Sequence, residues 1–217
     1  MCLAYVGETG KSGVTIPVRP SYILKAGCSL SGYWMDEKRE TEIIREVLAG
    51  NPGAFEELVR RYQGPVYSLM LRSLGNADDA ADLAQEAFAR AYTRLETFKF
   101  GKRFFPWLYS VSMNVLRDRV RAMGRDFHVY METDALPAQA ENAVDEREAV
   151  ETRLDGEKAF EVVLRLAPKY REALILRFRY DFTMREIART LGVSVSGAKM
   201  RVGRGLDMVR EEFGRNE

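Results

Sequence analysis

The residues best suited to chemistry in this 217-residue chain combine positive charge with aromatic rings. Within residues 98–109, six aromatic side chains are interleaved with Lys99, Lys102 and Arg103. Cations can follow a phosphate backbone while rings stack on bases, so this composition favours the binding of unpaired nucleotides. The segment is therefore a candidate nucleic-acid surface.

The same segment must also supply a hydrophobic core. We expect most of its aromatic stripe, including Phe105 and Trp107, to be buried, which leaves the loop rings Phe98 and Phe100 as stronger binding candidates. On the helix that follows, polar side chains recur at spacings of three or four and therefore share one face. They are Asn114, Arg117, Asp118 and Arg121.

A second candidate surface lies near the C-terminus. Thr183 and Glu186 have the spacing of a capping box at a helix start. Gly192 permits a left-handed turn, after which a serine can cap the next helix. Two helices joined by a tight turn form a helix-turn-helix, whose second helix can reach phosphates and guanine edges. Its outward cations are Lys199, Arg201, Arg204 and Arg210.

The formal net charge of +1 conceals a strong segregation of charge. Residues 97–125 carry +6, residues 126–161 carry −8, and residues 162–217 carry +5. Two basic blocks separated by an acidic block predict two anion-binding surfaces joined by a segment that avoids nucleic acid. A helical interaction or scaffold protein would explain the amphipathic stripes but not this segregation.

Composition excludes several other classes of protein. Cys2 and Cys28 are the only cysteines and His128 is the only histidine, which argues against a disulfide framework, a zinc site and most triad chemistry. Acidic residues at helical spacing between Asp79 and Glu86 lack an accompanying histidine, so a partner-facing patch is expected there rather than a metal site. No run of 18 apolar residues occurs. We therefore expect that the protein is neither an enzyme nor a membrane protein and that it binds no cofactor or metal.

The apolar residues follow a helical period from Met35 onward, with no alternating strand pattern, so the predicted fold is all-α. Residues 1–34 are rich in Gly, Ser and Pro and are expected to be a disordered extension, with Met35 as the working translation start. Two small helical domains are predicted at 35–125 and 154–217, joined by an acidic linker at 126–153. Packing of the domains against each other would cover both DNA surfaces, but the sequence alone does not establish it.

These motifs together resemble the bacterial RNA polymerase sigma factors of the extracytoplasmic-function (ECF, group 4 sigma-70) family. The resemblance covers about residues 36–213. Residues 79–92 and 105–114 are similar to the signature of the family's sigma-2 domain. Residues 166–173 and 182–194 resemble its sigma-4 domain, a helix-turn-helix.

The resemblance implies a cytoplasmic protein that binds core RNA polymerase, recognises the −10 and −35 promoter elements and directs transcription initiation. Its implied partners are the clamp helices and flap of the polymerase, promoter DNA and an anti-sigma factor, with no small-molecule substrate. The helix that would bind the clamp carries Asp79, Asp82, Leu83, Gln85, Glu86, Phe88 and Arg90.

The DNA-binding residues follow from the same resemblance. The −10 element would be recognised and opened by Phe98, Lys99, Phe100, Lys102, Arg103, Trp107, Asn114, Arg117 and Arg121. The −35 element would be bound by Thr183, Arg185, Ser194, Ser196, Lys199, Arg201 and Arg204.

The recognition helix departs from the family pattern. Gly197 and Ala198 stand where a Thr-Val pair is usual, and Gly205 stands where Ala is usual. Together with Gly203, these positions place three glycines in or near this helix. Each glycine lowers the stability of a helix by about 1 kcal/mol relative to Ala, so we expect this helix to be less stable when it is free of DNA.

The main alternative function is a stand-alone helix-turn-helix regulator. Such a protein should bind duplex DNA tightly without polymerase, whereas a sigma factor should do so poorly. The regulator leaves the aromatic, basic segment near residue 100 unexplained.

Overall fold

The computed structural model describes residues 36–132 and 159–214, and every regular element within these ranges is helical. This confirms the all-α prediction. The expected N-terminal extension and most of the expected linker lie outside the described residues. The elements are α1 (Glu37–Leu48), η3 (Pro52–Ala54), α2 (Phe55–Leu74), α3 (Ala77–Thr93), η4 (Leu95–Thr97), α4 (Phe104–Ala122), α5 (Phe127–Glu132), a helical stretch at 159–165, α7 (Pro168–Leu174), η5 (Ile175–Arg179), α8 (Met184–Leu191) and α9 (Val195–Gly214).

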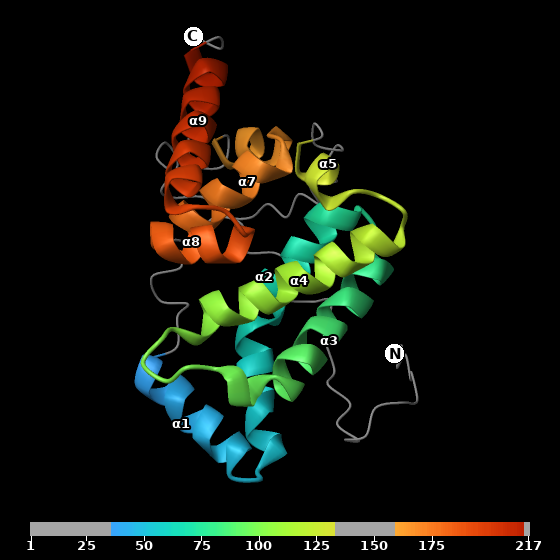
Figure 1. Cartoon of the computed structure of the whole chain (residues 1–217), viewed down its shortest axis with the longest axis vertical. Coiled ribbons are helices and arrows are strands. Elements are labelled where there is room, and N and C mark those ends of the chain that lie inside the picture. Colours follow the sequence, from blue (N-terminus) through green and yellow to red (C-terminus); the bar gives the residue numbers. More distant parts are fainter. Residues whose placement is uncertain (1–35, 133–158, 215–217) are drawn as a thin grey trace, which may run out of the picture.

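The first part of the molecule is a helical bundle. Figure 1 shows α2, α3 and α4 side by side, with α1 at one end of the bundle. Their apolar stripes meet in a core that includes the fully covered Tyr62, Phe88 and Leu108. The sequence shows two successive stripes around Pro65, and the structure joins them into one helix, α2, with Pro65 in its interior.

Helix boundaries in the bundle follow local chemistry. Gly75 ends α2 with a left-handed φ of 71°, a conformation that glycine adopts without strain. The side chain of Asn76 then accepts hydrogen bonds from the backbone N–H groups of Asp78 and Asp79, at 2.9 and 3.0 Å, and so caps the start of α3.

The C-terminal part contains the predicted helix-turn-helix. Thr183 and Glu186 form the capping box of α8, and Gly192 ends this helix with a φ of 69°. Ser194 Oγ accepts from the backbone N–H of Gly197 at 3.0 Å and so caps α9. The small residues Ala188 and Ala198 are buried where α8 and α9 pack together.

A short helix occupies the start of the expected linker, which corrects that part of the prediction. Asp126 Oδ1 accepts from the backbone N–H of His128 at 2.6 Å, and α5 follows. Met131 is buried, and the Tyr130 hydroxyl donates to the carbonyl of Ser73 at 3.4 Å. The apolar side chains of α5 extend over little more than one helical turn, and so short a pattern does not predict a helix within an acidic segment.

The glycines of α9 are not equivalent. A Cβ added at Gly203 would meet nothing within 4 Å, whereas one added at Gly205 would lie 3.0 Å from two carbons of Leu174 in α7. Gly205 therefore lets α9 approach α7 closely, whereas no neighbouring atom requires a glycine at position 203.

We expect Gly203→Ala to raise the free energy of unfolding by about 1 kcal/mol, because it removes backbone freedom from the unfolded chain without a clash. Gly205→Ala should gain nothing or lose stability, because Leu174 must move. Urea denaturation of both variants tests this, and equal stabilisation by the two substitutions would contradict it.

Candidate nucleic-acid interface

The loop that precedes α4 presents one aromatic ring to solvent. Phe100 is 47% exposed, and the guanidinium of Arg45 in α1 lies 5.4 Å from the centre of its ring. Phe98 is only 6% exposed and packs edge-on against Phe100 and Trp107, so its expected role in stacking on bases is corrected to support of this loop. Trp107 is partly exposed beside it.

A buried carboxylate from α1 holds the start of α4. Glu40 is 5% exposed and accepts a hydrogen bond from the backbone N–H of Phe104 at 3.3 Å and another from the Tyr62 hydroxyl. Burial raises the pKa of this carboxyl above its ordinary value, and the two hydrogen bonds oppose the rise only in part. Glu40 thereby fixes the end of the loop that carries Phe100. The sequence gives no local sign of this contact, which joins residues 64 positions apart.

The polar face of α4 is formed as its spacing predicts. Asn114 and Arg121 are exposed, and Arg117 is partly covered. Arg117 donates to Asn114 Oδ1 at 2.6 Å, and its guanidinium lies 5.0 Å from the ring centre of Phe127 in α5. Lys99 and Lys102 in the adjacent loop are exposed, so the predicted −10 surface combines exposed cations with the exposed ring of Phe100 and the partly exposed ring of Trp107.

The expected polymerase-binding residues of α3 divide into two groups. Leu83 and Phe88 are 5% and 0% exposed, so both belong to the core, and their expected role in contacting a partner is corrected. Asp82, Gln85 and Glu86 are exposed.

Two other expected contact residues of α3 pair with α4. Asp79 accepts from Arg119 at 3.0 Å, and Arg90 contacts Asp118 at 2.5 Å. Both pairs lie at the surface between α3 and α4, where solvent screens them, so the apolar packing of the two helices is what fixes the position of the exposed acidic face.

The helix-turn-helix presents its cations unequally. Lys199 and Arg204 on α9 are exposed, as are Arg185 and Ser196. Arg201 is partly covered, and burial lowers the pKa of its guanidinium below the ordinary value. Lys199 and Arg204 therefore present more of their charge to a ligand. Thr183 and Ser194 are exposed but already serve as helix caps.

The two helical parts meet at a buried polar cluster. Glu172 in α7 accepts a hydrogen bond from the Tyr109 hydroxyl at 2.8 Å, and its Oε2 lies 3.2 Å from Arg72 Nη2 in α2. The side chains of Arg72 and Glu172 are only 10% and 3% exposed. Burial by itself raises the pKa of Glu172, but the positive charges of Arg72 and Arg171 outweigh it and hold this pKa below its ordinary value. Glu172 is therefore ionised at neutral pH.

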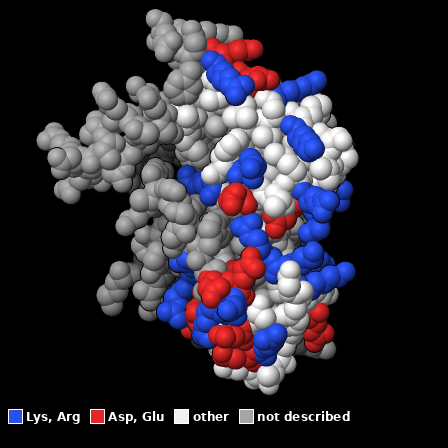
Figure 2. Space-filling model, turned by 90° about the vertical axis from the view of Figure 1, so that its left-hand side faces the viewer, with Lys and Arg blue, Asp and Glu red and all other residues white. Residues whose placement is uncertain are grey.

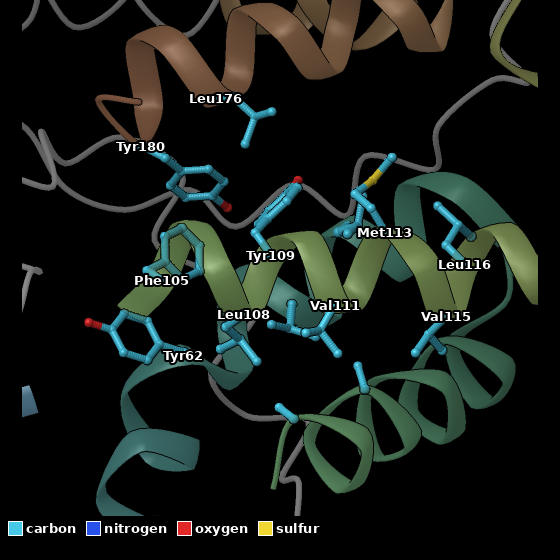
Figure 3. Close-up of a cluster of buried hydrophobic side chains, with 14 of the residues drawn as sticks. Tyr62, Phe105, Leu108, Tyr109, Val111, Met113, Val115, Leu116, Leu176 and Tyr180 are labelled. Atoms are coloured by element: carbon cyan, nitrogen blue, oxygen red, sulfur yellow. The ribbon is translucent and has the colours of Figure 1, made fainter. Parts of the chain in front are cut away.

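Aromatic rings surround this cluster. Figure 3 shows Phe105 and Tyr109 of α4 directed toward Tyr180, which follows η5. The ring centres of Phe105 and Tyr180 are 5.2 Å apart, and those of Phe105 and Phe182 are 5.6 Å apart. η5 is a π-helical turn, a local widening that is common at functional sites, and it leads directly into Tyr180.

Charged side chains are spread along the face of the molecule shown in Figure 2. Lys and Arg side chains extend over its length, and Asp and Glu side chains lie among them at the top, in the middle and in the lower part. Within residues 36–132 and 159–214, no three His, Cys, Asp or Glu side chains are grouped to hold a metal ion. Across the same residues no helix is long and apolar enough to span a membrane.

Comparison with known proteins assigns both parts of the chain. Residues 58–126 match the family model of Sigma-70 region 2, and residues 157–209 match that of Sigma-70, region 4. The ECF RNA polymerase sigma factor SigW of Bacillus subtilis is 31% identical, over 78% of this chain and 94% of SigW. The ECF RNA polymerase sigma-E factor of Escherichia coli is 29% identical, over 77% of this chain and 90% of that protein.

Two solved structures share the fold. CnrH, in complex with the cytosolic domain of CnrY, covers 84% of this chain and 100% of its own, with a TM-score of 0.54 and 24% identity. The sigma factor RpoE of Bartonella quintana, in complex with the anti-sigma factor NepR, covers 75% and 98%, with a TM-score of 0.50 and 23% identity.

Two helical units, one with a basic aromatic loop and one with a helix-turn-helix, thus define a two-part DNA-binding protein. The chain belongs to the ECF family of RNA polymerase sigma factors. It is a promoter-recognising initiation factor, and the stand-alone regulator is not favoured because it leaves the region 2 match unexplained.

Proposed function

We propose that residues 35–125 form the sigma-2 domain, which binds core polymerase and the −10 element, and that residues 154–217 form the sigma-4 domain, which binds the −35 element. The observation that carries this division is the pairing of an exposed ring, Phe100, with free cations in the first unit, and of a capped helix-turn-helix with exposed cations in the second.

The first unit has the chemistry needed to hold an unpaired strand. Phe100 can stack on a base while Lys99 and Lys102 follow the phosphates. Selective binding of unpaired bases shifts the melting equilibrium of the duplex, so strand opening requires no catalytic group. The exposed Asp82, Gln85 and Glu86 of α3 form a separate acidic face, which we assign to the polymerase clamp.

The protein would act in the cytoplasm, where promoter DNA and polymerase are found. The fold relationship to RpoE, which was solved with the anti-sigma factor NepR, and to CnrH, which was solved with the cytosolic domain of CnrY, supports an anti-sigma factor as a further partner.

In vitro transcription with core RNA polymerase on fragmented DNA from the source genome tests the proposal. Start sites preceded by a shared pair of sequence elements support it. No specific starts, combined with tight duplex binding in the absence of polymerase, would overturn it in favour of a stand-alone regulator.

Three variants separate the proposed roles. Phe100→Ala should reduce strand opening, read by permanganate reactivity of unpaired thymines, with polymerase binding unchanged. Lys199→Ala combined with Arg204→Ala should lower the affinity for the −35 element and make this affinity less dependent on salt concentration. Asp82→Ala should weaken polymerase binding. If all three variants lose the same step, the division of roles is wrong.

A further inference from the structure

Helix α1 holds the loop that carries Phe100 at two points. At the end of the loop, Glu40 accepts a hydrogen bond from the backbone N–H of Phe104 at 3.3 Å. Nearer its middle, the guanidinium of Arg45 lies 5.4 Å from the centre of the Phe100 ring, within the range of a cation–π contact. Figure 1 shows this loop beside α1. Helix α1 is therefore part of the surface around the exposed ring, although it precedes the residues that match Sigma-70 region 2.

The charge of Arg45 is not neutralised by a carboxylate. Arg45 is exposed, and within residues 36–132 and 159–214 no acidic side chain forms an ion pair with it. The neighbouring carboxylates are engaged by Arg39 instead, whose guanidinium lies 3.5 Å from Glu42, 3.6 Å from Glu46 and 2.7 Å from Glu57. Arg39 and Arg45 are six positions apart, so at about 3.6 residues per turn their side chains leave α1 in different directions. Arg45 thus presents its charge beside the ring.

The cations of the loop itself are divided. Its two lysines are exposed, whereas Arg103 is turned toward the C-terminal unit. Arg103 donates to the backbone carbonyls of Asp181 at 3.0 Å and Tyr180 at 3.4 Å. In this structure the third exposed cation beside Phe100 is therefore Arg45, which α1 supplies.

Support of the ring alone does not require an arginine. At an exposed site a cation–π contact adds only a small stabilisation, and an apolar side chain would cover the ring equally well. The guanidinium has a second use, because a base that stacks on Phe100 brings the backbone of its strand next to Arg45. Arginine suits such a position, since its planar group stacks on a ring and its N–H groups bind phosphate.

We propose that Arg45 and Phe100 form one nucleotide-binding site, in which the ring stacks on an unpaired base of the −10 element and Arg45 binds a phosphate of the same strand. This inference rests on the proposed function of the first unit and adds α1 to its DNA surface. A ring beside a cation is the combination that proteins use to hold single strands. The two residues are 55 positions apart, so no local pattern in the sequence connects them.

The salt dependence of binding separates a phosphate contact from support of the ring. The probe is promoter DNA with a paired −35 element and an unpaired −10 strand, titrated with the holoenzyme at several salt concentrations. One phosphate contact to a single strand contributes about 0.7 to the slope of log affinity against log salt, which is about fivefold in affinity at about 0.1 M salt. Arg45→Gln should lower the affinity and the slope by these amounts. Arg45→Lys keeps the charge and should keep the slope.

Arg39→Ala is the matched control, because it removes an arginine of the same helix whose charge is already paired. Its slope should equal that of the unaltered chain. An unchanged slope for Arg45→Gln would overturn the proposal even where the affinity falls, since Arg45 would then only support the ring. Equal flattening by Arg39→Ala, or flattening by Arg45→Lys, would overturn it as well.

Failure of the proposed function gives a different result. If the unaltered holoenzyme binds the fully paired form of the probe as tightly as the form with the unpaired strand, the first unit does not hold an unpaired −10 strand. The division of roles between the two units is then wrong, whatever the slopes of the Arg45 variants.

Discussion

Replacing Phe105 with Ala is expected to lower the free energy of unfolding by about 3 to 5 kcal/mol, the usual cost of removing a buried aromatic ring. Phe105 is 1% exposed, stacks on Tyr62 with ring centres 5.0 Å apart, and contacts Tyr180 and Phe182 of the other domain. The cavity would therefore open at a junction of α2, α4 and the segment after η5.

Chemical denaturation with urea measures this loss, and Phe178→Ala is its matched control. Phe178 lies in η5 but is 62% exposed, so its removal should change stability by no more than about 0.5 kcal/mol. Because Phe105 contacts both domains, Phe105→Ala should also separate their unfolding transitions. Equal losses for the two variants would contradict the packing described for Phe105.

The parts of the fold that the sequence predicts depend on neighbouring residues. The capping box at Thr183 and the left-handed turn at Gly192 are each complete within four residues, and the structure forms both. The helical stripes are likewise local, because a period of 3.6 is visible in any window of a few turns.

The sequence could not separate core from contact surface within a single helix. Leu83 and Phe88 belong to the same signature as the exposed Asp82 and Glu86, yet they face the bundle. A resemblance between sequences identifies the helix as a unit and does not say which of its side chains are covered. The expectation that Phe98 stacks on bases is wrong for a related reason. Phe98 lies in a loop, but its ring packs against those of Trp107 and Phe104.

The contact between the domains was beyond prediction altogether. Arg72 and Glu172 are 100 positions apart, and Ser110 and Thr190 are 80 apart, so no local pattern connects them. Each residue read alone is an ordinary polar residue on a predicted helix. Only the packing of α7 and α8 on the bundle brings these residues into pairs.

Removing either partner of the buried ion pair is expected to cost about 3 to 5 kcal/mol, because the charge left behind has lost both its counterion and its water. The variants are Arg72→Met and Glu172→Gln. Glu172→Gln leaves two cations, Arg72 and Arg171, without the carboxylate that Tyr109 also contacts. The double variant should lose less than the sum of the two single losses, by about 0.5 to 3 kcal/mol.

The same cycle on Asp79 and Arg119 provides the control. That pair has a similar separation of 3.0 Å, but its side chains are 48% and 44% exposed. Solvent screens it, so its coupling should be about 0.5 kcal/mol or less. Similar couplings for the two pairs would contradict the burial of Glu172.

Acid provides an independent check on the charge of Glu172. Its pKa in the folded protein lies below the ordinary value of 4.5, since the charges of Arg72 and Arg171 outweigh the effect of burial. The stabilisation from its ionised form is therefore complete above about pH 4.5 and is lost as the pH falls through the folded-state pKa. The stability difference between the unaltered chain and Glu172→Gln should be largest near neutral pH and shrink in acid. A difference that stays constant with pH would show that packing, rather than charge, holds α7 against the bundle.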